Sequence, residues 1–385
     1  MFRFISRKSL RVLLLVVVIL SLGFLSSRAL AETQATGWNF ELVDENGQGR
    51  AALALDPSNR LHIAYYGIDD LGQRGLKYAF YDGAIWNIEM VDNNTSASYI
   101  TIAADDLNRP HIAYYDSRNK ELRYATYDIE WALSVIDDKG DVGRSPDIQV
   151  DSLNLPHVAY WDQTNEAVKY ARFDGAKWNI ETVADMSGCN GYLPTVSLAL
   201  DPSNKPHISY DSCKSHNLKY AHKESGSWVL KTVDSNTNSG RFSDIVVDSK
   251  GGIHISYRAT GLMYAYNDGT GWKISKADTG FLAGSFSSIG VDSNFRPHIS
   301  YVNTTIDGAV ELRHAYYNGF GWISELLLTR TNPGSFDNTS LAVSPDNKIF
   351  LAFWDGQPNS VRYATSKVKS TIVSVYLPFA LSLHK

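Results

Sequence analysis

Residues 110–128, PHIAYYDSRNKELRYATYD, decide how this chain is interpreted, because the sequence contains nearly the same phrase several times. A close copy, PHVAYWDQTNEAVKYARFD, begins at Pro156, and shorter copies begin at Pro206 and Pro297. Looser copies start at Leu61, Ile253 and Ile349. A catalytic motif usually occurs once, whereas a phrase that returns at a fixed period is the unit of a repeat architecture. We therefore interpret the phrase as scaffold.

Each copy contains four short runs with strand character, which are labelled a to d in chain order. In the second copy they are ITIAAD (100–105), HIAYYD (111–116), ELRYATYD (121–128) and WALSVID (131–137). The runs are rich in β-branched and aromatic residues and are bounded by Asp, Asn, Gly or Pro, as strands are. No segment beyond the N-terminus shows a sustained helical period. The sequence predicts an all-β protein.

The number of units follows from the tryptophans that begin the d runs. They are Trp38, Trp86, Trp131, Trp178, Trp228, Trp272 and Trp322. The a–b–c sets also number seven, but the first d run (37–44) precedes every set, and no Trp-led run follows the last set. A four-stranded unit cannot bury both of its faces alone, so units stack until a ring closes. We predict a seven-bladed β-propeller of four-stranded blades, closed by the N-terminal d strand in the last blade. Residues 370–385 are the rival source of that strand.

Both ends of the chain fall outside the repeats. Basic residues within positions 3–11 precede the apolar run VLLLVVVILSLGFL (12–25) and an A-x-A sequence at 29–31, the pattern of a cleaved secretory signal peptide. We expect a signal peptide (1–31), a propeller (35–367) and an apolar C-terminal tail (368–385) that is too short to span a bilayer. The protein is expected to be secreted, extracellular or at the cell surface, with no membrane span after signal cleavage.

The net charge and the cysteines limit which partners, disulfides and cofactors are expected. The net charge of -5 predicts no basic face, so no nucleic-acid partner is expected. Cys189 and Cys213 fall in the d–a and b–c loops of one blade, which share a face of a propeller. Secretion permits disulfides, so we predict that these two cysteines pair. The sequence contains no CxxC or HExxH motif, and neither a metal nor another cofactor is expected.

Six histidines occupy one position of the repeat, an arrangement that suggests a metal ring. They are His62, His111, His157, His207, His254 and His298. Each belongs to a different blade, and separate blades are too far apart to share one ion at bonds of about 2 Å. We interpret them as buried residues that hydrogen-bond to the backbone of their own or the next blade. The Asp that opens the a–b turns, which Ser344 replaces in the last repeat, is interpreted as a turn former, and the repeated Tyr and Trp as packing between blades.

The repeats also resemble a known grouping. The phrase LKYAFYDGAIWNIEMVD (76–92) is similar to repeats of secreted bacterial propellers of the sialidase-like, BNR or Asp-box-related type, and the resemblance spans residues 37–367. The segment DGAIW (82–86) is one residue shorter than the S-x-D-x-G-x-x-W box and lacks its Ser, and the FRIP-type motif is absent. The resemblance therefore implies the fold, and no catalytic residue of the grouping carries over.

Function is expected where the repeats differ, at the channel mouth formed by the d–a and b–c loops. We predict a ligand site with Tyr115, Trp161 and Trp354 as stacking platforms, and with arginines and carboxylates that bond hydroxyl groups. Those polar residues are Arg144, Arg241, Arg258, Asp116, Asp162 and Asp355. Aromatic faces with charged groups beside them suit a sugar. The alternative is that these side chains only cap the channel.

The sequence favours a non-catalytic propeller, expected to be a monomer, that binds a glycan or another cell-surface ligand. A glycosidase needs two carboxylates at a defined separation, and Asp116, Asp162 and Asp211 occupy equivalent repeat positions, which favours a role at strand ends. No catalytic residue is therefore assigned. The alternatives are a sugar-active enzyme, either a sialidase-like glycosidase or a polysaccharide lyase, and a protein–protein interaction scaffold.

Overall fold

The computed structural model describes residues 35–367, apart from 190, 215, 237, 332–335, 337 and 357–358. The predicted signal peptide and the tail (368–385) lie outside these residues. The described part of the chain consists of β-strands and their connections. Within it, no helix is long and apolar enough to cross a membrane.

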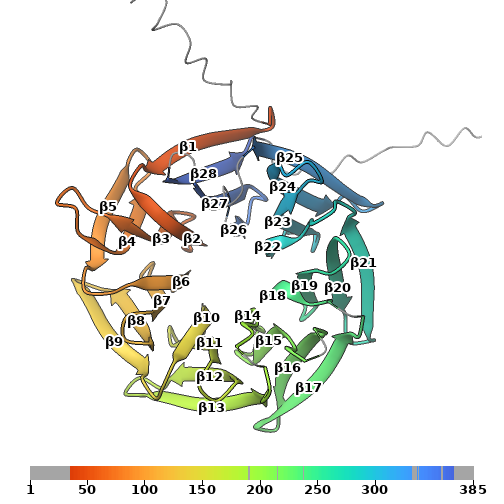
Figure 1. The fold of residues 1–385 in the computed structure, drawn as a ribbon, viewed down its shortest axis with the longest axis horizontal. Helices are drawn as coiled ribbons and strands as arrows, with labels where there is room; N and C mark the ends of the chain where they lie inside the picture. Colours follow the sequence, from red (N-terminus) through yellow and green to blue (C-terminus); the bar gives the residue numbers. More distant parts are fainter. Residues whose placement is uncertain are drawn as a thin grey trace, which may run out of the picture. The chain divides into compact units, whose positions relative to one another are not determined.

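The strands form seven four-stranded antiparallel blades around a central opening (Figure 1), which confirms the predicted seven-bladed β-propeller. Blade 1 contains β2 (Gly47–Leu55), β3 (Leu61–Ile68), β4 (Arg74–Tyr81) and β5 (Trp86–Asp92). Blade 2 contains β6 (Ala97–Ala104), β7 (Pro110–Asp116), β8 (Glu121–Tyr127) and β9 (Trp131–Asp137). Blade 3 contains β10 (Val142–Val150), β11 (Pro156–Asp162), β12 (Ala167–Phe173) and β13 (Trp178–Asp185). Blade 4 contains β14 (Val196–Leu200), β15 (Pro206–Asp211), β16 (Leu218–Glu224) and β17 (Ser227–Asp234). Blade 5 contains β18 (Arg241–Val247), β19 (Ile253–Arg258), β20 (Leu262–Asn267) and β21 (Trp272–Asp278). Blade 6 contains β22 (Ser285–Val291), β23 (Pro297–Thr304), β24 (Val310–Tyr317) and β25 (Trp322–Arg330). Blade 7 contains β26 (Thr339–Val343), β27 (Ile349–Asp355), β28 (Ser360–Ser366) and the N-terminal β1 (Trp38–Asp44).

The ring is closed by the N-terminal strand, as predicted. Strand β1 pairs antiparallel with β28, with Trp38 opposite Ser366. The Trp38 ring packs edge-on against His314 of blade 6 at 5.3 Å, and its Nε1 donates a hydrogen bond of 3.1 Å to Glu325. The first described strand therefore holds the last blade against its neighbour, and the C-terminal tail is not needed as the outer strand.

The Tyr and Trp of the repeat pack between blades, as the sequence predicts. The d-strand Trp131 of blade 2 meets the c-strand Tyr78 of blade 1 edge-on at 5.1 Å, and the same T-shaped contact recurs around the ring. The other pairs are Tyr124–Trp178, Tyr170–Trp228, Tyr220–Trp272, Tyr264–Trp322 and Tyr363–Trp86. Edge-to-face geometry places the positive ring edge on the negative ring face, which stabilises each blade junction beyond burial alone.

Five of the six histidines are buried and His207 is half-buried, but their partners differ from the prediction. In blade 2, His111 Nδ1 lies 2.5 Å from the Tyr124 hydroxyl and its Nε2 lies 3.2 Å from the carboxylate of Asp105 in the a–b turn. The partners are thus side chains of the same blade, where backbone groups were expected. Burial lowers the pKa of His111, which keeps the ring neutral and suited to this bridging role.

The predicted disulfide is present between Cys189 and Cys213, whose Cα atoms lie 5.3 Å apart. Both residues are buried in an apolar cluster that also contains Trp161, Met186 and Tyr210. The bridge therefore ties the d–a loop before blade 4 to the b–c loop of blade 4.

Candidate functional site

The innermost strands line a cavity of about 260 Å³ in the central channel. Two levels of side chains surround it, each contributed by equivalent positions of the seven repeats, in the a strands or directly before them. The upper level, here called the mouth ring, consists of Arg50, Tyr99, Ser145, Thr195, Phe242, Phe286 and Asn338. The level below, here called the inner ring, consists of Ala52, Thr101, Asp147, Ser197, Asp244, Ser288 and Ser340.

Four residues of the mouth ring have an unusual backbone. Tyr99, Ser145, Phe242 and Phe286 have φ angles of 50°, 48°, 54° and 51°. Left-handed conformations are rare for bulky residues and cost on the order of 1–3 kcal/mol each. They occur where the pairing of strands a and b shifts register, for example between Ser98 and Thr101. The bulges turn side chains toward the channel. The free-energy cost of the strained backbone is one that proteins typically retain at functional sites.

Arg50 extends between blades at the channel mouth. Its guanidinium carbon lies 4.6 Å from the ring centroid of Tyr99 in blade 2 and 5.4 Å from that of Phe286 in blade 6. Both distances are within the range of cation–π attraction. One cation and two aromatic rings from three blades therefore gather at one opening.

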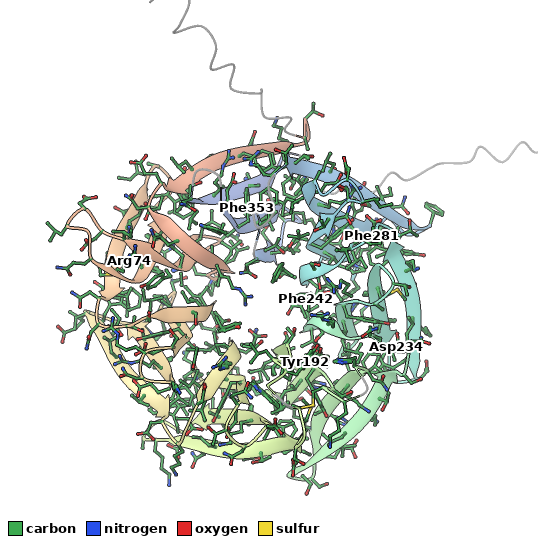
Figure 2. All side chains as sticks on the ribbon, in the orientation of Figure 1. Arg74, Tyr192, Asp234, Phe242, Phe281 and Phe353 are labelled. Carbon is green, nitrogen blue, oxygen red and sulfur yellow. A yellow bond between two sulfur atoms is a disulfide. The ribbon has the colours of Figure 1, made fainter. Side chains whose placement is uncertain are left out.

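A second group of charged and aromatic residues lies at blades 4 and 5. Arg241 and Arg258 are directly opposite each other in β18 and β19, and their guanidinium carbons lie 5.6 and 5.0 Å from the Phe242 ring centroid. Figure 2 shows Phe242 and Tyr192 on the side of the ring toward the central opening. Burial and the charge of Arg241 lower the pKa of Arg258, because two neighbouring cations repel each other. This pair would be stabilised by an anion.

Asp211 lies beside these arginines. It accepts hydrogen bonds from the Tyr192 hydroxyl at 2.5 Å and from the Thr195 backbone amide at 3.2 Å. Burial raises its pKa to about 6, although Tyr192 and Arg241 favour the charged form. The carboxylate therefore compensates part of the local positive charge, and it is already occupied by protein donors.

Two acidic side chains of the inner ring share a hydroxyl group. Ser197 Oγ lies 2.8 Å from Asp147 Oδ2 and 2.7 Å from Asp244 Oδ1, so the three residues connect blades 3, 4 and 5. A hydroxyl group has one hydrogen, so it donates to one carboxylate and accepts from the other only if that one is protonated. Burial, followed by the charge of Asp244, raises the pKa of Asp147 to about 7, and burial also raises the pKa of Asp244. The geometry fits one proton held by the pair.

The inner ring also has a structural task. The backbone amide of Leu198 donates to Asp147 Oδ2 at 2.7 Å, and that of Ile289 donates to Asp244 Oδ2 at 2.8 Å. Equivalent bonds from the next blade reach Thr101, Ser197, Ser288 and Ser340. The inner ring therefore joins neighbouring a strands, and Asp147 and Asp244 are the two acidic members of this set.

The predicted aromatic platforms are not equally accessible. Trp161 is fully buried beside the disulfide, which corrects the premise that it is exposed. Tyr115 is buried as well, and its hydroxyl donates to Asp141 at 2.8 Å. Trp354 is half-buried and donates to the Gly47 carbonyl at 3.2 Å. Each ring therefore has a partner within the protein.

The predicted carboxylates lie at strand ends beneath the loops, and all three are buried. Asp116 accepts from the Ser96 amide at 3.0 Å, and Asp162 accepts from the Lys169 ammonium group at 2.6 Å. Asp355 forms an ion pair with Arg330. These contacts organise the b–c and d–a loops and leave little capacity for a ligand hydroxyl.

The predicted arginines lie nearer the opening. Arg144 lines the channel cavity but forms a two-pronged ion pair with Asp141, at 3.0 and 2.8 Å. Arg241 and Arg258 belong to the pair described above. Sequence reasoning missed the contribution of Phe242, Asp147 and Asp244, although the last two replace Ser, Thr or Ala at a repeat position and could have been noticed for that reason.

Comparisons with known proteins show which solved structures share the fold of this chain. No protein-family model and no curated protein matches the sequence, so the resemblance to sialidase-like repeats stays a prediction. Among solved structures, the chain is similar to a polysaccharide lyase, an ulvan lyase bound to -[GlcA(1-4)Rha3S]-, at 11% identity and a TM-score of 0.56 over 86% of this chain and 95% of that one. It is also similar to AofleA from Arthrobotrys oligospora (12% identity, TM-score 0.50, 75% and 89% covered) and to the Aleuria aurantia lectin in complex with alpha-methyl-L-fucoside (12%, 0.50, 79% and 99%). Identities this low show a shared propeller fold.

Proposed function

We propose that this protein is a secreted propeller that binds an acidic glycan at the channel mouth without cleaving it. The observation that carries the proposal is the convergence of Arg50, Arg241 and Arg258 with the rings of Tyr99, Phe242 and Phe286 at one opening. Aromatic faces stack on sugar rings, and guanidinium groups bind carboxylates or sulfates through paired hydrogen bonds. The proposal keeps the predicted Arg144, Arg241 and Arg258 at the site and replaces the buried Trp161 as a platform by Phe242.

Two further points support a sugar ligand. The backbone strain of Tyr99, Phe242 and Phe286 is concentrated where a ligand would bind, and strain of this kind is retained where function needs it. Propellers with the same fold include an ulvan lyase solved with a glucuronate-containing sugar and a lectin solved with a fucoside. A ring of blades can therefore present a sugar site.

The test is a glycan array followed by titration of the strongest ligands. Acidic chains such as polygalacturonate, alginate and chondroitin sulfate are compared with neutral dextran of similar length. Arg258→Met removes one cation and keeps a side chain of similar length, and it should weaken binding of an acidic chain at least about tenfold. Preference for neutral chains, or unchanged affinity in both Arg258→Met and Arg241→Met, would contradict the proposed site.

A sugar-active enzyme remains the second candidate, and the acidic pair of the inner ring is the observation that favours it. Asp147 and Asp244 lie at the base of the same cavity, and a carboxyl group with a pKa of about 7 has the property of a general acid. If the purified protein shortens an acidic glycan, Asp147→Asn should abolish that turnover while binding is retained. If no turnover is detected on any glycan that binds, the non-catalytic function stands.

A further inference from the structure

One blade junction departs from the others in a way that leaves a cavity. At the junctions entering blades 1, 2, 3 and 6, the last Asp of one d strand contacts both a Tyr of the next b strand and a Lys or Arg of the next c strand. In blade 3, Asp137 accepts from Tyr160 at 2.7 Å and lies 3.4 Å from the Lys169 ammonium group. In blade 2, Asp92 accepts from Tyr114 at 2.7 Å and lies 3.2 Å from Arg123. A buried Tyr hydroxyl and a half-buried cation thus share one carboxylate.

The junction between blades 3 and 4 keeps the Tyr and the Lys but lacks the Asp. In strand β13, WNIETVAD, one residue more separates the Trp from the Asp than in β5, WNIEMVD, and Ala184 pairs with Val168 where Asp92 pairs with Leu76 in blade 1. Tyr210 and Lys219 remain opposite each other in β15 and β16, as Tyr160 and Lys169 are in blade 3. The carboxylate position of the repeat is therefore occupied by a methyl group.

The junction between blades 6 and 7 also lacks the Asp, but it differs from the junction between blades 3 and 4 because the Tyr that would bind the carboxylate is replaced by an apolar residue as well. Leu328 stands in place of the Asp, and Phe353 stands in place of the Tyr, so no hydroxyl is left without a carboxylate. The equivalent Arg362 lies 3.3 Å from Asp355 instead. At the junction with Ala184, by contrast, the polar groups that normally bind a carboxylate are kept.

A cavity of about 510 Å³ lies at this junction and is lined by Ala184, Tyr210 and Lys219 together with Lys214 and Lys231. It shares no lining residue with the channel cavity. Lys219 donates to Thr232 at 2.7 Å, and burial alone raises the pKa of Tyr210 to about 12, without the contribution that Asp44 makes at Tyr65. Asp185, the displaced acid, also lines the cavity, but it is exposed and accepts from the Ser187 amide at 2.9 Å.

We propose that this junction cavity binds a small carboxylate, with the ligand carboxylate taking the place that Asp occupies at the other junctions. Tyr210 would donate its hydroxyl hydrogen and Lys219 its ammonium hydrogens, and Lys214 and Lys231 add positive charge at the entrance. The volume is that of a site for a ligand of about monosaccharide size, and a uronic acid meets both requirements. Binding in this cavity does not depend on the glycan site at the channel mouth.

The test is calorimetric titration of the purified protein with sodium D-glucuronate and sodium acetate at constant ionic strength, with D-glucose and sodium sulfate as controls. Saturable binding of the carboxylates and not of glucose is expected. Ala184→Asp should supply the missing carboxylate from the chain itself, raise the melting temperature and weaken glucuronate binding at least about tenfold. Tyr210→Phe and Lys219→Met should weaken glucuronate binding as well, and these two variants provide the test if Ala184→Asp does not fold.

Three results would overturn the proposal. The first is the absence of saturable binding of either carboxylate. The second is binding of sulfate alone, which would exclude a carboxylate as the ligand class. The third is glucuronate binding that persists in Ala184→Asp but is lost in Arg258→Met, because that pattern would place the ligand at the channel mouth.

Discussion

Asp147→Asn tests whether the inner ring holds a proton. Asn has the shape of Asp, and its oxygen at the Oδ2 position can accept from both the Ser197 hydroxyl and the Leu198 amide, while its NH2 group takes the Oδ1 position beside Thr101 Oγ1. The change removes only the ionisable group. Burial and the neighbouring Asp244 raise the pKa of Asp147 from 3.8 to about 7.

The sign of the effect follows from this shift. In the unfolded chain Asp147 loses its proton near pH 4, whereas in the folded protein it keeps the proton until about pH 7. The folded state therefore binds more protons in this window, and the native protein loses stability as pH rises through it. Each pKa unit corresponds to about 1.4 kcal/mol, and water in the channel reduces the full effect, so we expect about 1–2 kcal/mol between pH 5 and pH 8. Asp147→Asn should lack this loss.

The assay is urea unfolding of the native protein and of Asp147→Asn at pH 5, 6, 7 and 8. The free energy of unfolding of the variant minus that of the native protein should increase with pH. Asp82→Asn is the control, because Asp82 is exposed in a turn and hydrogen bonds lower its pKa, so its difference should stay flat in this range. Parallel curves for Asp147→Asn and the native protein would show that Asp147 takes up no extra proton on folding.

Three further predictions concern stability. Reduction of Cys189–Cys213 should lower the free energy of unfolding by roughly 3.5 kcal/mol in the chain-entropy model, measured by urea unfolding with and without reductant; an unchanged midpoint would contradict it. Deletion of β1 (Trp38–Asp44) should expose the edge of β28 and cause aggregation or a large fall in melting temperature, and a deletion variant that melts like the native protein would refute N-terminal closure. Trp161→Ala should cost about 3–5 kcal/mol because the ring is fully buried, and a change below about 1 kcal/mol would contradict its place in the core.

The fold could be predicted because its determinants are local and repeated. The d-run tryptophans gave the number of blades, and the order of Trp38 relative to the first a–b–c set gave the closing strand. The pairing of Cys189 with Cys213 followed from the faces on which loops of a propeller lie. These features depend on the alternation of four antiparallel strands and require no knowledge of side-chain packing.

The site was harder to predict because it depends on contacts between blades. Trp161 and Tyr115 lie near the ends of b strands, as an exposed platform would, yet both are buried. Trp161 packs in the cluster that contains the disulfide, and Tyr115 donates to Asp141 of the next d–a loop. Phe242 faces the channel because a bulge turns the backbone to a positive φ, and the sequence does not reveal that bulge. The histidines were predicted to be buried, but Tyr and Asp partners six to sixteen residues away could not be assigned before the strands were paired.

The central claim is that the channel mouth binds an acidic glycan through Phe242 and the arginines beside it. The most direct measurement is the dissociation constant of one acidic glycan for the native protein, for Phe242→Ala and for Phe320→Ala. Phe320 is 91% exposed in a c–d turn, on the face opposite the d–a and b–c loops, so it is a matched aromatic control. Loss of a stacking face should cost about 1–1.5 kcal/mol, a weakening of about tenfold, in Phe242→Ala and nothing in Phe320→Ala. Equal affinities for all three proteins would contradict the claim.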